Sequence, residues 1–319
     1  MIFVRILVYG AGVIGCELAH ELCKSENDVT ILARGNWKRS LDKNGLVIRH
    51  YGQFRTTIDC VKTIETLDVD YNYDLIFVVM QYNQVLEIIP KLARNISRYI
   101  VLVGNNMNPA YCREQICNQS HTEKEIAFGF QGSGGYKEND RVISMHFNRL
   151  IMTLGGLTEH LTTEFKRNII MAFEKTVYKL IWEQHMEGWL LSHVAHILPT
   201  AYICYSLDCN LKRVRKEKIS MAVEAVAEAH KMLKKLGYPI RPDGEEEAYV
   251  EKRKKKQRML YLMVKTPAGK FVISNHCANA ICEMTALDRE FEKLKRKSGM
   301  SMPAWDKLRK EAVIAIDEI

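Results

Sequence analysis

The feature that most constrains this chain is a glycine-rich turn that lies between an apolar run and an amphipathic segment. Residues 6–9 read ILVY, residues 10–15 read GAGVIG, and residues 16–23 repeat apolar side chains at helical spacing. The order of strand, glycine turn and helix is the context in which a G-x-G-x-x-G pattern indicates dinucleotide binding. A strand-to-helix turn without a ligand is the alternative, because glycine turns are common.

Each glycine of such a turn has its own role. Gly10 allows the tight turn, Gly12 lets the backbone approach a pyrophosphate, and Gly15 lets the helix pack close to the strand. The first N–H groups of the new helix and its positive dipole end would then bind the phosphates. We therefore predict that Gly10, Gly12, Val13, Ile14 and Gly15 contact a cofactor.

Length and composition indicate a globular protein with two domains. The chain has 319 residues, of which 47% are hydrophobic and 26% are charged, and these values are ordinary for a soluble protein. No run of eighteen apolar residues occurs, so no membrane-spanning helix and no membrane partner are expected. The apolar start differs from a signal peptide, because Arg5 and the glycines interrupt it. We expect a cytoplasmic protein.

The cysteine spacing and the charge distribution indicate neither a cysteine metal site nor a nucleic-acid-binding surface. The nine cysteines are scattered without a C-x-x-C motif, which predicts buried, reduced thiols and no metal site. The net charge is +8, and residues 252–256 read KRKKK after a glutamate run at 245–247. With acidic residues alongside and no interleaved aromatic residues, a solvated helix face is favoured over a nucleic-acid patch.

Hydrophobic patterning divides the chain into two parts. Apolar runs alternate with helical segments in the first part, which predicts a doubly wound α/β sheet of the Rossmann type over residues 1–161. In the second part apolar residues recur three and four positions apart, which predicts an all-α domain over residues 162–319. The strands expected in the first part are 28–33, 46–50, 54–60, 73–79, 99–103, 126–130, 142–147 and 150–154, and the helices expected in the second are 162–175, 185–206, 210–236, 245–264, 275–297 and 303–316.

The residue after the second strand indicates which nucleotide binds. A ribose-binding acid is expected about twenty residues past the glycines, but this chain has Arg34 there, with Lys38 close behind. A guanidinium pairs with a 2′-phosphate through a charge-assisted fork. The sequence therefore predicts NADP rather than NAD as the cofactor, held in part by Arg34 and Lys38.

Ligands of such sheets bind outside the carboxyl ends of the strands. Gln81 and Gln84 follow one buried strand, and Asn105 follows another. We predict that all three line the cofactor crevice, although each is also an ordinary turn or helix-cap residue.

These residues resemble the ketopantoate reductase family, whose members reduce 2-dehydropantoate to pantoate with NADPH. The resemblance implies a homodimer, an Asn105 that touches the nicotinamide end of the cofactor, and a late serine and glutamate that hold substrate and cofactor, here Ser274 and Glu283. In this chain the spacing between Ser274 and Glu283 is shorter than the spacing of the corresponding residues in the family. The segments that carry the resemblance are ILVYGAGVIG (6–15), VTILARG (29–35), KNGLVI (43–48), DLIFVV (74–79), VLVGNNM (101–107) and LGG (154–156).

The second half departs from the family pattern at its catalytic helix. The family has a lysine two residues past a tryptophan, followed by two asparagines and a proline. Here residues 189–199 read WLLSHVAHILP, with Leu190 or Leu191 at the lysine position and neither asparagine. A further family lysine is replaced by Gln81, while Lys175 and Lys179 are upstream alternatives if the register is shifted.

Two histidines lie on this helix. Reduction of a ketone needs an acid that protonates the forming alkoxide, and histidine titrates near neutrality. His193 and His196 are three residues apart and share a face, with Glu187 and Glu283 as candidates to orient an imidazole. Ordinary packed helix histidines are the alternative.

Three functions follow as hypotheses. The first is an NADP-dependent reductase of a small 2-oxo acid, similar to ketopantoate reductase, with Asn105 and Glu283 in the catalytic group. The second is an opine- or hydroxy-acid-type dehydrogenase that uses His193 or His196. The third is an NADP-binding protein that has lost turnover together with the lysine.

Overall fold

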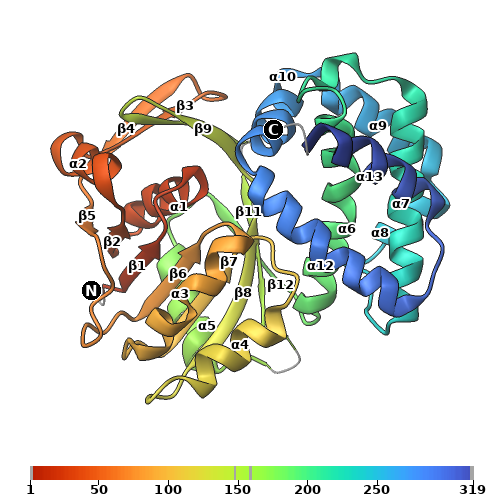
Figure 1. The fold of residues 1–319 in the computed structure, drawn as a ribbon. Coiled ribbons are helices and arrows are strands. Elements are labelled where there is room, and N and C mark those ends of the chain that lie inside the picture. The colour runs from red at the N-terminus through yellow and green to blue at the C-terminus, as the bar shows by residue number, and fades with distance from the viewer. Residues whose placement is uncertain (1–2, 147–148, 158–159, 317–319) are drawn as a thin grey trace. The chain divides into compact units, whose positions relative to one another are not determined.

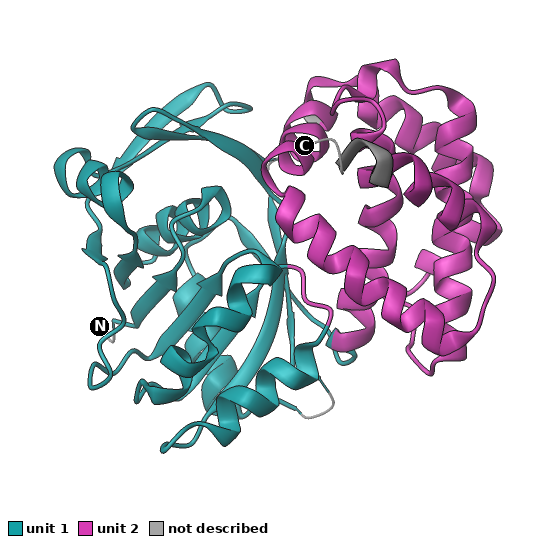
Figure 2. Ribbon diagram, in the orientation of Figure 1, with its two compact units in different colours: residues 1–104, 108–186 teal, residues 105–107, 187–319 magenta. Residues whose placement is uncertain are grey.

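The structure is a computed structural model that describes residues 3–146, 149–157 and 160–316. Its contacts divide the chain into two compact units, residues 1–104 with 108–186 and residues 105–107 with 187–319 (Figure 2). Each unit is described by itself.

Unit 1 is built on a predominantly parallel sheet, as the sequence predicts. Within the described residues the sheet has eight strands in the order β12-β11-β8-β7-β6-β1-β2-β5, and only the β8–β11 pair is antiparallel. The central strands β6 and β7 are buried along their whole length, as strands covered on both faces are. The strands are β1 (Arg5–Tyr9), β2 (Asp28–Leu32), β5 (Lys62–Ile64), β6 (Leu75–Val79), β7 (Tyr99–Val103), β8 (Glu125–Gln131), β11 (Leu150–Gly155) and β12 (Tyr178–Trp182).

A second, smaller sheet packs on the first helix of this unit. Its described strands are ordered β4-β3-β10-β9, and β3 and β4 form the antiparallel hairpin expected over residues 46–60. Helix α1 contacts β3, β9 and β10, so the small sheet lies over it (Figure 1). The elements are β3 (Leu46–His50), β4 (Arg55–Asp59), β9 (Gly134–Glu138), β10 (Arg141–Met145), α1 (Val13–Lys24), α2 (Gly35–Asn44), α3 (Tyr82–Arg94), α4 (Pro109–Asn118) and α5 (Thr163–Phe173).

Unit 1 extends beyond the boundary expected at residue 161. Helix α5 is held to this unit because the Asn27 side chain donates a hydrogen bond to the Ala172 carbonyl oxygen over 2.8 Å. The Phe173 ring lies edge-on to Phe77, with the ring centroids 5.7 Å apart. The strand β12 then pairs in parallel with β11. Residues 178–182 carried no strand prediction, because a mostly apolar run of five residues is too short to distinguish a strand from a helix turn.

Unit 2 is helical over its described residues, which confirms the predicted fold class of a Rossmann-type sheet followed by an all-α region. Three of the predicted helices are shorter or interrupted. The third, fourth and fifth of the expected segments break near residues 214, 251 and 280. The elements are α6 (Met186–Tyr205), η1 (Leu211–Arg213), α7 (Lys216–Lys235), α8 (Glu245–Val250), α9 (Arg253–Lys265), α10 (Pro267–Gly269), η2 (Lys270–Ser274), α11 (Asn275–Asn279), α12 (Ile281–Ser298) and α13 (Pro303–Ile316).

Two expectations about the surface can be compared with the structure. All nine cysteines are free, but the prediction that they are buried is wrong for Cys60, Cys117 and Cys282, which are exposed. The basic run at the start of α9 is offset by carboxylates, as Lys252 pairs with Glu247 over 2.7 Å. Among the helices that the structure describes, none is both long and apolar enough to cross a membrane.

Candidate functional site

The glycine turn occupies the carboxyl end of β1, at the centre of the parallel sheet. Gly10 has a φ of +127°, and a Cβ there would lie 2.2 Å from the Val79 carbonyl oxygen. A Cβ on Gly15 would lie 2.0 Å from the Gly10 carbonyl oxygen. Both positions therefore require glycine for reasons of packing and backbone conformation. These contacts join the turn to the neighbouring strand β6.

Gly12 differs from the other two glycines, because it is exposed and open. No heavy atom lies within 4 Å of the position that a Cβ would take. Gly12 is the N-cap of α1, and the first hydrogen bond of the helix runs from the Cys16 amide to the Gly12 carbonyl over 2.9 Å. The helix itself cannot satisfy the amides of Val13, Ile14 and Gly15. The turn thus presents amide donors beside open space, which fits an anionic group such as a pyrophosphate.

A pocket of about 490 Å³ lies beside the carboxyl ends of β1 and β2. Arg34 lines it, as expected of a residue that follows β2. Lys91 and Arg94 of α3 add two further cations that the sequence analysis missed; their three-residue spacing on one helix face was the available signal. The pocket is lined by Tyr9, Arg34, Gly35, Glu65, Thr66, Leu67, Val69, Lys91 and Arg94.

Three further residues predicted to contact the cofactor, Lys38, Gln81 and Gln84, do not line this pocket. Lys38 is on α2, where its ammonium group pairs with Asp42 over 2.7 Å, and it does not line the pocket. Gln81 is the N-cap of α3, and the Gln84 amide donates to the Gln81 carbonyl over 2.9 Å. Both glutamines follow β6 at its carboxyl end and do not line this pocket, so their contact with a cofactor stays a prediction.

Unit 2 brings Asn105 and Glu283 together, although they are far apart in the sequence. The Asn105 amide donates to the Glu283 carboxylate over 3.2 Å, and both side chains are buried. His276 Nε2 lies 3.9 Å from the other carboxylate oxygen of Glu283. Ser274 is buried at the end of the π-helical turn η2. In the chain, Asn105 follows β7 after a single glycine.

The aromatic residues of α6 form a row along one face of the helix. The rings of Trp189 and His193 are parallel within 5° with centroids 5.2 Å apart, and those of His193 and His196 are 6.4 Å apart at 6°. Burial lowers the pKa of His193 to about 3, and the neighbouring His196 and His276 lower it further in the same direction. His193 is therefore a neutral imidazole near pH 7.

His196 is held by residues of α8 rather than by either glutamate expected to orient an imidazole. Its Nδ1 lies 3.4 Å from the Glu245 carboxylate and is hydrogen-bonded to the Tyr249 hydroxyl. The hydrogen bond with His196 lowers the pKa of Glu245 to about 2 against the opposing effect of burial, with Lys256 contributing. No local pattern indicates this pairing, because Glu245 lies about fifty residues beyond His196 in the chain.

The positions that the family pattern assigns to lysine carry no charge here. Leu190 and Leu191 are each 1% exposed. Lys175 pairs with Glu26 over 3.0 Å and Lys179 lies on β12, so both belong to unit 1. A second cavity, of about 170 Å³, lies in unit 2 beside Asp288 and Arg309. Those two side chains bond one another.

The sequence match now decides the family. Residues 6–158 match the model of the family described as ketopantoate reductase PanE/ApbA. This region belongs to the ketopantoate reductase family. The predicted resemblance is confirmed for these residues, which are thereby homologous to NAD(P)-dependent oxidoreductases. Among curated proteins, no sequence matches the chain significantly.

Solved structures resemble the whole chain in fold at low sequence identity. The 2-dehydropantoate 2-reductase of Geobacter metallireducens GS-15 has a TM-score of 0.76 at 16% identity and covers 98% of this chain and 100% of that chain. A PanE/ApbA family ketopantoate reductase of Ralstonia eutropha JMP134 has a TM-score of 0.71 at 12% identity and covers 98% of each chain. D-mandelate dehydrogenase in a ternary structure with NADH and anilino(oxo)acetate has a TM-score of 0.74 at 14% identity and covers 98% of each chain.

Proposed function

We propose that the protein is an NADP-dependent oxidoreductase that reduces a small 2-oxo acid to a 2-hydroxy acid. The observation that carries the proposal is made at the carboxyl ends of β1 and β2, where Gly12 is exposed after β1 and Arg34 lines a pocket after β2. NADPH, when bound, supplies the hydride that the ketone carbon accepts. A cytoplasmic location and a homodimer are part of the proposal and rest on the sequence and its family resemblance.

The pocket favours NADP through its charge. Arg34, Lys91 and Arg94 present three cations against the single carboxylate of Glu65. A 2′-phosphate carries nearly two negative charges near neutral pH, and a guanidinium binds it through paired charge-assisted hydrogen bonds. A ribose diol would instead need a carboxylate acceptor at the end of β2, where this chain has Arg34.

The candidates for a role in the reduction are residues of unit 2, namely Asn105, Glu283 and the histidines of α6. Asn105 has a buried side-chain oxygen without a hydrogen-bond partner among the described residues, so it can accept a bond from a carboxamide such as that of nicotinamide. Glu283 holds the Asn105 amide in place. The alkoxide that forms on the ketone oxygen takes its proton from an acid. We assign this role to His196 in place of the family lysine, because His193 is a neutral imidazole near pH 7.

One experiment distinguishes binding of the 2′-phosphate by Arg34 from non-specific attraction of nucleotides to a basic surface. Removing a charge-assisted hydrogen bond costs about 1.5–3 kcal/mol, so Arg34→Gln is expected to raise the Kd for NADPH about 10- to 100-fold and to leave the Kd for NADH unchanged. Lys43→Gln removes the same charge from an exposed position on α2 that does not line the pocket. Equal effects of the two variants, or equal losses for both nucleotides, would refute the assignment.

A second experiment tests the histidines. Turnover of NADPH with a panel of 2-oxo acids is measured for His193→Gln and His196→Gln, with the Kd for NADPH as the internal control. The acid role predicts that one variant loses at least about 100-fold in kcat, the usual contribution of a general acid, while NADPH affinity is unchanged. Two fully active variants would exclude a histidine acid.

A hydroxy-acid dehydrogenase is the second candidate. It is favoured by the similarity in fold to D-mandelate dehydrogenase across nearly the whole chain and by the two histidines on α6. The same panel run in the direction of oxidation, with 2-hydroxy acids and NADP⁺ or NAD⁺, distinguishes it. A wild-type protein that binds NADPH but transfers no hydride in either direction would support neither enzyme and would favour a binding protein.

A further inference from the structure

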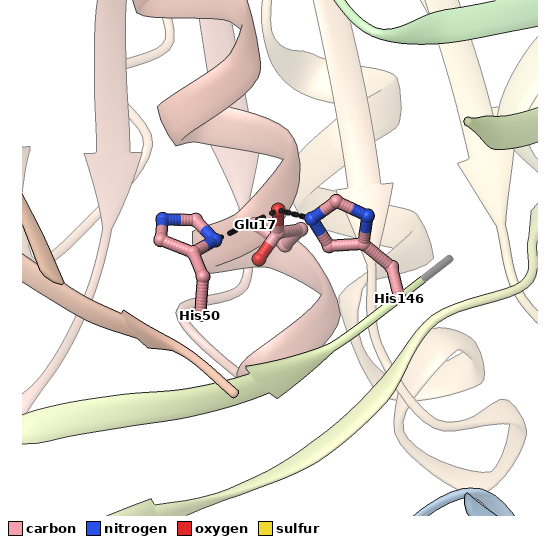
Figure 3. Close-up of side chains that lie close together, drawn as sticks. All are labelled: Glu17, His50 and His146. Atoms are coloured by element: carbon pink, nitrogen blue, oxygen red, sulfur yellow. Dashed lines mark ion pairs between the residues drawn. The ribbon is translucent and has the colours of Figure 1, made fainter. Parts of the chain in front are cut away.

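Three ionisable side chains from separate elements of unit 1 converge away from the glycine turn. Glu17 is on α1, His50 ends β3, and His146 directly follows β10 (Figure 3). They meet because β3 and β10 are neighbouring parallel strands, with Ser144 paired to His50, and both strands contact α1. The prediction of no metal site rested on the spacing of the cysteines and did not include these three residues, which lie far apart in the chain.

The burial of this group is unusual for charged residues. Glu17 and His50 are both 0% exposed, and His146 is 9% exposed. Neither the two carboxylate oxygens of Glu17 nor His50 Nδ1 has a hydrogen-bond partner within the described part of the chain. A buried carboxylate without hydrogen bonds is unfavourable unless a cation compensates it. The structure thus leaves both carboxyl oxygens of Glu17 without a hydrogen-bond donor at the centre of the group, and a bound cation would compensate for this.

Neighbouring side chains do not supply that charge, because they are paired among themselves. His20 Nδ1 is 2.6 Å from the Asp59 carboxylate. Glu21 accepts a hydrogen bond from the Val177 amide over 2.9 Å and pairs with Lys24. The basic residues closest in sequence to Glu17 are therefore engaged with other carboxylates.

The distances within the group fit a common metal ion. Glu17 Oε1 lies 3.5 Å from His146 Nε2 and 4.0 Å from His50 Nδ1, and the ligand atoms of all three residues lie within 4.8 Å of one another. These separations are too long for good hydrogen bonds. Two atoms bound to one tetrahedral zinc ion at about 2.0–2.1 Å lie about 3.3 Å apart. Small side-chain rotations therefore suffice to close the group around an ion.

The ligand types and their support also suit zinc. Two imidazoles with one carboxylate are a known zinc set that leaves a fourth position for water, whereas Mg²⁺ and Ca²⁺ prefer oxygen ligands alone. His50 Nε2 is 2.8 Å from the Thr57 hydroxyl, which fixes the ring with Nδ1 toward Glu17. Metal-bound histidines are commonly oriented in this way through the second nitrogen.

We propose that Glu17, His50 and His146 bind one zinc ion that ties α1 to the small sheet of unit 1. Because α1 begins at Gly12, the ion would fix the helix whose first turn faces the open space at the glycine turn. Because the three ligands are buried, the ion would hold α1 and the two strands together, with water as its fourth ligand. The proposal is independent of the reaction that the protein catalyses.

The test uses the full-length protein after treatment with a chelator. Zn²⁺ titration followed by metal analysis is expected to give one ion per chain for wild type, with a rise in melting temperature. Glu17→Gln keeps the size of the side chain but removes the anionic ligand, and is expected to lose the ion. His121→Gln, at an exposed position, is the matched control and is expected to bind as wild type does.

Thr57→Val keeps all three ligands and guards against a variant that fails to fold. Loss of such an orienting partner typically weakens metal binding 10- to 100-fold, an effect that a merely structural polar cluster would not show. Co²⁺ in place of Zn²⁺ is expected to give the visible bands of a tetrahedral nitrogen and oxygen site. Sulfur-to-cobalt charge-transfer bands, or equal zinc binding by wild type and Glu17→Gln, would overturn the proposal.

Discussion

The glycine turn allows the same substitution to be made at two positions with opposite expected effects. A methyl group at Gly12 would meet no heavy atom within 4 Å, and the backbone there has an ordinary φ of −73°. A methyl group at Gly15 would lie 2.0 Å from the Gly10 carbonyl oxygen. Gly12→Ala should therefore preserve the fold and impair nucleotide binding, whereas Gly15→Ala should impair the fold itself.

The expected magnitudes differ enough to be separated. For Gly12→Ala, the loss of unfolded-state entropy stabilises by about 0.4–1 kcal/mol, and the poorer N-cap offsets a similar amount. The free energy of unfolding should thus change by less than about 1 kcal/mol. The methyl group would displace a phosphate from one or two amide hydrogen bonds of about 1.5–3 kcal/mol each, which raises the Kd for NADPH at least tenfold.

Gly15→Ala forces two backbone segments apart by more than 1 Å, because real contacts of a Cβ with oxygen exceed 3 Å. Overpacking of this kind costs about 1–3 kcal/mol, which lowers the melting temperature by about 2–4 °C per kcal/mol for a unit of this size. Thermal melting with and without NADPH and a fluorescence titration of NADPH measure both effects. Gly132→Ala, at another open position, is the control.

Two results would refute this reasoning. Gly12→Ala that binds NADPH as tightly as wild type would show that no phosphate approaches this residue. Gly12→Ala that melts as low as Gly15→Ala would show that the open space at Gly12 is filled in the folded protein.

Three further predictions concern unit 2. The pKa of His193 is about 3 in the folded state and about 6.5 in the unfolded state. As the pH falls from 6.5 toward 3, only the unfolded state takes up the proton, so the free energy of unfolding decreases. In urea denaturation, His193→Gln should reduce the slope of this decrease by up to about 1.4 kcal/mol per pH unit. The pKa of Glu245 is lowered to about 2. Its carboxylate therefore stabilises the folded state above pH 4.5, and this stabilisation is lost as the pH falls toward 2. Glu245→Gln should lower the free energy of unfolding at pH 7 by about 1–3 kcal/mol. Arg309 donates to both oxygens of the buried Asp288 carboxylate over 2.8 Å. Arg309→Met should therefore lower the free energy of unfolding by about 3 kcal/mol in thermal denaturation, and the loss should be smaller when Asp288→Asn is combined with it.

Local patterns were sufficient to predict the glycine turn and the sheet of unit 1. The glycine turn needs only neighbouring residues to form, because strand, turn and helix are continuous in the chain. The residue that follows β2 is likewise placed by the strand itself, so Arg34 could be assigned to a pocket before the pocket was known. The alternation of strands and helices predicted the sheet for the same reason. The edge strand β12 and the breaks near residues 251 and 280 were missed, because their residues do not differ from helical ones in pattern.

The sequence by itself determined the Rossmann-type sheet, the glycine turn with its exposed Gly12, and the cation that follows β2, since each depends on contacts between near neighbours in the chain. Only the tertiary structure decided which distant side chains meet. The pairing of Asn105 with Glu283, the capture of His196 by Glu245, and the convergence of His50 and His146 on α1 all join segments far apart in sequence. No local pattern encodes such contacts, because they arise when strand pairing and helix packing bring separate elements to one place.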